Sequence, residues 1–159
     1  MNTRPIAEAI AAELEAAVPD IPVFIGYPRA ETIGEVAVSH TDPEGRVACI
    51  YVARERSLPM TSETDRGRVP IGCQVHWNHT FEIGFFVSEF GDQQDYLQSR
   101  VDQILDHFQS VRTLNDLVFG IARPLTLNRI GAAEMWGIGG WLAHFELTVY
   151  AIETGVTPT

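Results

Sequence analysis

The feature that most constrains this chain is its closing segment, residues 141–152, in which apolar and polar residues alternate. Since successive side chains of a strand point to opposite faces of a sheet, this alternation predicts a strand with one buried face. The odd positions hold Trp141, Ala143, Phe145, Leu147, Val149 and Ala151, whereas the even positions include His144, Glu146 and Thr148. A chain that ends in such a strand needs an apolar layer to cover that face.

Two amphipathic helices are predicted to supply this layer. The first follows Pro5, which suits the first turn of a helix, and ends before Pro19. The second follows Asp92, a residue type that caps helix N-termini. Their apolar stripes are Ile6, Ile10, Leu14 and Val18 in the first helix, and Leu97, Val101, Ile104, Leu105, Phe108 and Val111 in the second. From these stripes and the closing strand we predict a core that includes Leu14, Val101, Leu105, Phe108, Phe145 and Leu147.

The rest of the chain predicts further strands and no second domain. Strands are expected near residues 21–27, 34–40, 46–53, 69–88 and 141–152. The sequence Asp-Pro-Glu-Gly at 42–45 favours a turn that joins two of them as a hairpin. We therefore predict a single α+β domain over residues 1–159, with a mainly antiparallel sheet of about five strands and both helices on one face.

Two segments lack the periodicity of helices and strands. Residues 54–68 are polar and charged and predict a long hairpin loop, which is either a working surface or a solvated tip. Residues 121–140 hold Pro124 and several glycines and predict an irregular stretch, in which Trp136 either reaches the surface or closes the edge of the core. The candidate contact residues for partners are Arg54, Arg56, Leu58, Met60, Arg66, Arg68 and Trp136.

The composition limits the classes of partner. The chain has 11 basic and 21 acidic residues and a formal net charge of −10, so it repels phosphate backbones and is not expected to bind specific nucleic acid sequences. The sequence contains neither a signal-peptide pattern nor the roughly 20-residue apolar span of a membrane helix. We expect a protein made in the cytoplasm, with no membrane partner and with Cys49 and Cys73 as free thiols.

One cluster has the residue types of a zinc site. Cys73, His76 and His79 offer thiol and imidazole ligands within seven residues. In a strand, however, His76 points to the face opposite Cys73 and His79, so the three side chains do not converge unless a bulge intervenes. We expect no metal and no cofactor here.

No other motif indicates catalysis. His107 and His144 are single histidines on a helix and a strand, and neither has a serine or cysteine in a nucleophile motif beside it. The glycines at 137–140 lack the spacing of a dinucleotide loop and the lysine of a phosphate-binding loop. The sequence therefore favours a protein that is not an enzyme.

The layout as a whole resembles a known family. It comprises the first helix, the strand Ile-Pro-Val-Phe-Ile-Gly-Tyr-Pro at 21–28, a hairpin with a long charged loop, a helix at about 96–111, and the terminal strand Trp-Leu-Ala-His-Phe-Glu-Leu-Thr-Val-Tyr at 141–150. This order is similar to that of the tail-terminator, or tail-completion, proteins of long-tailed bacteriophages. The resemblance covers nearly the whole chain. It rests on the order of helices and strands and on local residue patterns, with no invariant motif.

The resemblance implies a structural virion protein that assembles as a ring, usually a hexamer. Such a ring caps the tail tube and faces the neck, so the implied partners are other copies of the chain, the tail tube protein and a neck or head-completion protein. A ring interface joins two different patches, and the arginines of residues 54–68 on an acidic chain provide opposite charges for it. One alternative is a head-completion or other neck connector protein. Another is a small metal-dependent hydrolase that uses Cys73, His76 and His79.

Overall fold

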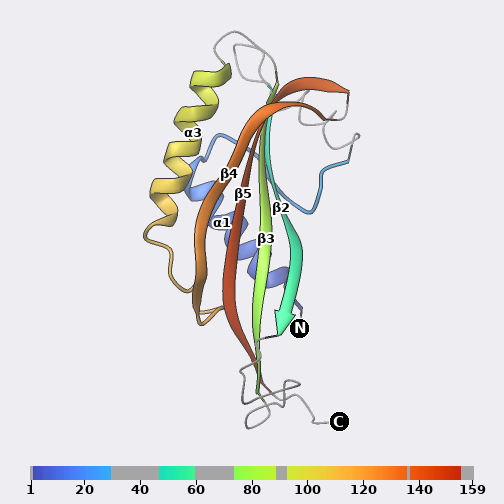
Figure 1. Ribbon diagram of the computed structural model, residues 1–159. Helices are drawn as coiled ribbons and strands as arrows, with labels where there is room; N and C mark the ends of the chain where they lie inside the picture. The colour runs from blue at the N-terminus through green and yellow to red at the C-terminus, as the bar shows by residue number, and fades with distance from the viewer. Residues whose placement is uncertain (1, 30–46, 60–73, 89–92, 136, 155–159) are drawn as a thin grey trace.

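The computed structural model describes residues 2–29, 47–59, 74–88, 93–135 and 137–154. It contains one five-stranded sheet with the strand order β1-β2-β3-β5-β4, and two helices that lie on one of its faces (Figure 1). The elements are α1 (Arg4–Ala17), β1 (Val23–Ile25), β2 (Ala48–Pro59), β3 (Gln74–Ser88), α3 (Gln93–Phe108), β4 (Gly120–Met135) and β5 (Ile138–Thr154). β1 runs parallel to β2, and all other neighbouring strands are antiparallel. The predicted α+β fold with a mainly antiparallel sheet is confirmed.

Both helices bury the apolar stripes that the sequence predicts. Pro5 lies in the first turn of α1, and the helix ends at Ala17. The amide of the next residue, Val18, donates a hydrogen bond to the carbonyl of Leu14. The stripe residues Ile6, Ile10, Leu14 and Val18 of the first helix, and Leu97, Val101 and Ile104 of α3, are all buried. The two helices pack against each other and against the sheet, so their apolar stripes form one layer with the strand residues of this face.

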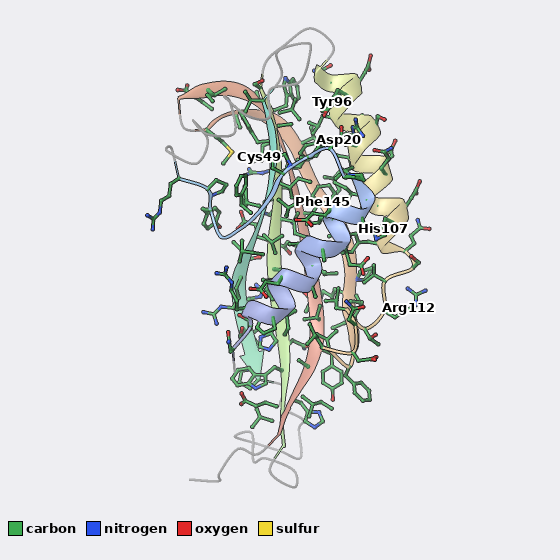
Figure 2. The ribbon with its side chains drawn as sticks, turned by 180° about the vertical axis from the view of Figure 1, so that it is seen from behind. Asp20, Cys49, Tyr96, His107, Arg112 and Phe145 are labelled. Carbon is green, nitrogen blue, oxygen red and sulfur yellow. The ribbon has the colours of Figure 1, made fainter. Side chains whose placement is uncertain are left out.

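The core lies between these helices and the sheet. Figure 2 shows Phe145 of β5 beneath α1, and this ring is fully buried together with Phe81 and Phe85 of β3. Of the predicted core residues, Leu14, Val101, Phe108, Phe145 and Leu147 are buried. The prediction for Leu105 is wrong, because this side chain lies at the margin of the α3 stripe and is only partly buried against the core.

β2 is longer than the sequence predicts. Residues 54–59 were expected to begin a loop, yet they continue β2 and pair with β3, from Arg54 opposite Phe81 to Pro59 opposite Trp77. Their polar character reflects exposure at the sheet edge rather than a loop conformation, since a strand can be held by backbone pairing on one side alone. This part of the predicted loop is therefore corrected.

β4 is the second correction. The prediction of an irregular stretch over residues 121–140 is wrong, because Gly120–Met135 form a strand that pairs with β5 along its length. This edge strand is half exposed and its pairing register shifts three times, so its apolar residues do not alternate. Only a few of them touch the core, and these are Ile121, Leu125, Leu127 and Ile130.

Several predictions fall outside the described residues. They concern the strand near 34–40, the turn at 42–45, the N-cap Asp92, and the side chains Met60, Arg66, Arg68, Cys73 and Trp136. In the part of the chain that is described, no helix combines the length and apolar character needed to cross a membrane.

Candidate functional site

The face of the sheet opposite the helices carries a polar network. Glu82 of β3 lies at its centre: Oε2 accepts a hydrogen bond from the Tyr27 hydroxyl at 2.8 Å, and Oε1 accepts one from Tyr51 at 3.1 Å. Nε2 of His144 lies 3.4 Å from the same Oε1. One carboxylate is therefore in contact with three side chains, which come from three separate parts of the chain. We call this set of residues, Tyr27, Tyr51, Glu82 and His144, the Glu82 cluster.

The two phenols of the Glu82 cluster are held in their protonated form. The hydrogen bond to Glu82, followed by burial, raises the pKa of Tyr27 to about 12. Burial, followed by the nearby Glu82 charge, raises the pKa of Tyr51 as well. The Tyr51 ring lies over Gly84, where an added Cβ would overlap it. Since both carboxylate oxygens already accept hydrogen bonds, this arrangement serves to fix side chains in place rather than to abstract a proton.

The same face also carries a buried pair of hydroxyls and a small apolar cluster. Near the middle, the hydroxyls of Thr80 and Thr148 lie 3.0 Å apart and both residues are buried. At one end the β4–β5 hairpin bends over the sheet (Figure 1), where a second small apolar cluster forms. This cluster consists of Cys49 and Phe86 with the partly buried Phe24, Met135, Ile138 and Leu142. Burial raises the pKa of the Cys49 thiol to about 12, so this free cysteine is an inert core residue, as predicted.

The histidines of the suspected zinc cluster lie on opposite faces of β3. His76 contacts the hydroxyl of Tyr150 on the helix-free face, whereas Nδ1 of His79 lies 2.7 Å from Oγ of Ser57 on the helix-covered face. Cys73 is outside the described residues, and among the described ones no three His, Cys, Asp or Glu side chains are grouped as metal ligands. The alternation of β3 thus separates His76 from His79 as the sequence predicts.

The Ser57–His79 contact was not anticipated, because the two residues are 22 positions apart and meet only through strand pairing. A serine beside a histidine is the start of a nucleophile–base pair, but such a pair needs an orienting third group and access to a substrate. His79 is 1% exposed, burial lowers its pKa, and Nε2 has no hydrogen-bond partner among the described residues. The contact therefore ties β2 to β3.

His107 likewise acquires a partner that the sequence did not indicate. Its Nε2 lies 2.6 Å from Oε2 of Glu13, which joins α3 to α1 at the outer surface of the helical layer (Figure 2). Beyond the end of α3, a pocket of about 420 Å³ opens between the helix and the start of β4. Its lining includes Arg112, which donates to the carbonyls of Gln109 and Val111, and the exposed ring of Phe119. This pocket brings no pair of acid and base side chains together.

The predicted partner contacts at the end of β2 point in different directions. A register shift between Arg54 and Arg56 places Arg54 opposite Phe81 on the helix-covered face and Arg56 opposite Thr80 on the helix-free face. Leu58, opposite Asn78, shares the face of Arg56 and is 55% exposed. Arg54 and Arg56, two members of the predicted basic cluster, therefore lie on opposite faces of the sheet.

This end of β2 also has an open backbone edge. β1 pairs only with Ile50–Val52, and within the described residues no strand pairs with the outer edge of residues 54–59. The opposite edge of the sheet is β4, whose outer side also has no strand partner in the described part. Exposed edges of this kind are used for contacts between chains unless they are covered.

The comparison with solved structures finds similar proteins, whereas the comparisons with family models and with curated sequences find none. Among solved structures, the chain is similar to the one titled "Cryo-EM Structure of an Extracellular Contractile Injection System, PVC sheath/tube terminator in extended state", with a TM-score of 0.42 and 10% sequence identity. The match covers 100% of this chain and 61% of that chain, so the present chain spans about three fifths of its length. This score is too low to establish a shared fold, and the function is therefore argued from the chain's own residues.

Proposed function

We propose that this chain is a non-enzymatic structural protein of the tail-terminator type. It forms a homo-oligomeric ring, usually a hexamer in the family it resembles, that caps a tail tube and joins it to the neck of the particle. The observation that carries the proposal is that two opposite edges of one sheet, the end of β2 and the outer side of β4, have no strand partner among the described residues. A subunit with two different contact edges suits a ring, in which each copy uses one patch toward the preceding copy and another toward the next.

The internal use of polar groups supports a structural role. In an active site, a base or nucleophile faces a cavity where a substrate can reach it. Here Glu82 is occupied by two tyrosines and a histidine, and His79 is buried against Ser57. These contacts connect strands to one another, which is what a rigid assembly subunit requires.

The position in the particle is the main test. Tails should be purified from an infection or expression system that makes no heads, and the protein should be located on them by immunogold labelling. We expect label at a single end, the end that receives the head, and tails of uniform length. Label that appears only on heads would favour the alternative of a head-completion or neck connector protein, and label along the tube or at the distal end would refute the terminator role.

The alternative of a metal-dependent hydrolase has a separate test. Elemental analysis of the protein purified without a polyhistidine tag should find no stoichiometric zinc, because the β3 alternation holds His76 and His79 on opposite faces. Stoichiometric zinc that is lost on Cys73→Ser would overturn the non-enzymatic proposal.

A further inference from the structure

The exposed end of β2 presents an apolar side chain next to a positive charge. Leu58 is 55% exposed, one of few large apolar side chains so exposed among the described residues, and Arg56 lies two residues before it on the same face. No described carboxylate lies within ion-pair distance of Arg56. A partner that covers this edge could bury the leucine and supply a carboxylate to the arginine. Both interactions would lower the free energy of the complex.

A complementary feature lies on the other side of the sheet. A pocket of about 380 Å³ opens between the N-terminal half of α3 and the β4–β5 hairpin. Its apolar walls are Leu97, Ile130 and Trp141, and its polar rim is Gln94, Asp95 and Gln98. Asp95 is exposed and has no described basic partner. The pocket therefore offers apolar surface beside a free carboxylate, the reverse of the Leu58–Arg56 pair.

The two features cannot meet within one subunit. The strand order β1-β2-β3-β5-β4 (Figure 1) puts β3 and β5 between β2 and β4, and Ile130 of β4 lines the pocket. Two complementary patches on opposite edges make a heterologous contact when two copies meet, and such contacts close into rings when the rotation between copies allows it.

We propose that the end of β2 docks into the 380 Å³ pocket between α3 and the β4–β5 hairpin of a second copy of this chain. Leu58 packs against Ile130 and Trp141 of the neighbour, and the Arg56 guanidinium pairs with the neighbour's Asp95. This inference rests on the proposed function, since it assigns the two surfaces through which copies of the ring subunit meet. The sheet topology shows two edges without a described strand partner. The proposal adds the side chains that make the contact, which are the Arg56–Asp95 charge pair and the apolar Leu58.

The charge of the chain explains why a specific pair is needed. Each copy has a formal net charge of −10, so two copies repel each other unless a local positive group meets a negative one. Added salt screens both this repulsion and the Arg56–Asp95 attraction, so a salt titration does not isolate the pair. A charge swap does, because it exchanges the two partners and leaves the net charge of the chain unchanged.

The test uses the full chain in a Cys73→Ser background and follows association by sedimentation velocity over a wide concentration range. Arg56→Asp and Asp95→Arg should each weaken association by about tenfold or more, as expected when a charge-assisted contact becomes a like-charge contact. The double variant should recover most of the lost association. Leu58→Ala should also weaken it, whereas Leu117→Ala, which truncates another exposed leucine that belongs neither to β2 nor to the pocket lining, should not.

Folding and proximity are checked with further variants. Asp95 lies in the first turn of α3, where an arginine disfavours the helix, so Gln98→Arg on the next turn provides a second way to repel Arg56. Circular dichroism and thermal unfolding verify that each variant is folded. Leu58→Cys combined with Gln98→Cys should form disulfide-linked multimers under oxidation, while either single variant should give far fewer.

The outcomes separate this inference from the function. Closed oligomers that form equally well with Arg56→Asp and with Asp95→Arg, or a double variant with no recovery, would overturn the docking proposal and leave the ring in place. A wild-type chain that stays monomeric at its highest soluble concentration, and whose double-cysteine variant gives no cross-linked species, also overturns it. If that chain is in addition absent from tail ends, the proposed function falls as well.

Discussion

The two faces of the sheet are built from the same strands but do different work. On β5, Phe145 and Leu147 point toward the helices and are buried among apolar groups, whereas His144 and Glu146 point away from them. On β3, Phe81 and Phe85 face the helices, and Glu82 faces the polar network. The comparison shows that the main apolar core lies on the helix-covered face, while hydrogen bonds between side chains join the strands on the helix-free face.

The sharpest test of this difference uses adjacent residues on β5. Phe145→Ala should lower the free energy of unfolding by about 3–5 kcal/mol, because it leaves a cavity in the core beneath α1. His144→Ala, on the other face, should cost about 1 kcal/mol or less, since it removes a partly exposed contact to Glu82. Urea unfolding of both variants measures the difference. Equal losses would show that the two faces contribute alike.

Close packing on the helix-free face gives the next largest effect. Gly84→Ala should cost about 1–3 kcal/mol, because the new methyl group overlaps the buried Tyr51 ring and must displace it. Gly131→Ala on the same face has open space around the new Cβ and should change stability by no more than about 0.5 kcal/mol. Denaturant unfolding of the pair checks whether the Tyr51–Gly84 contact is the rigid part of this face.

The helix-covered face could be predicted from the sequence, and the edges could not. α1, α3 and β5 each bury one side, so their apolar residues recur with the period of the element. β4 and the end of β2 lie at the sheet edges, where backbone pairing to a single neighbour holds the strand and little side-chain burial is needed. Their sequences therefore carry no clear period. The apolar stripe of α3 also did not show how far the core extends around the helix. Leu105 belongs to the stripe and yet is only partly buried.

The candidate site was even less predictable. The Glu82 cluster joins residues 27, 51, 82 and 144, which approach one another only through strand pairing and register. The same holds for Ser57 with His79 and for Glu13 with His107. In contrast, the separation of His76 from His79 followed directly from strand alternation. Arg56 and Leu58 are exposed, and their role as contact residues stays a prediction.

The Glu82 cluster can be tested through the ionisation of its phenols. Removing the negative charge with Glu82→Gln should lower the pKa of Tyr27 from about 12 toward the ordinary tyrosine value of about 10. Glu146→Gln, the cross-strand neighbour of Glu82, makes no hydrogen bond to Tyr27 and is the control. Ultraviolet titration of phenolate, with Tyr27→Phe to assign the signal, measures the shift. An unchanged titration in Glu82→Gln would mean that Tyr27 is not bound to Glu82.

The same raised pKa values predict a loss of stability in alkali. A tyrosine whose pKa is higher in the folded state stabilises the fold fully below its unfolded pKa of about 10, and this contribution is lost as the pH rises through the folded value. For Tyr27 the window is therefore pH 10 to about 12, and Tyr51 acts in the same direction. Unfolding free energies at increasing pH should fall less steeply for the Tyr27→Phe, Tyr51→Phe double variant than for the wild type.

The smallest expected effect concerns the polar pair on the helical side. Glu13 and His107 lie 2.6 Å apart but are 28% and 30% exposed, so water screens their interaction and their coupling in a double-mutant cycle should be about 0.5 kcal/mol. The cycle uses Glu13→Ala, His107→Ala and the double variant, with urea unfolding at a single pH. The pair His144–Glu82 is less exposed, 18% on each side, and Glu82 also binds two tyrosines, so its cycle should give the larger coupling despite the longer distance of 3.4 Å. A larger coupling for Glu13–His107 would mean that the helical layer depends on polar contacts more than the helix-free face does. The proposed difference between the two faces would then be wrong.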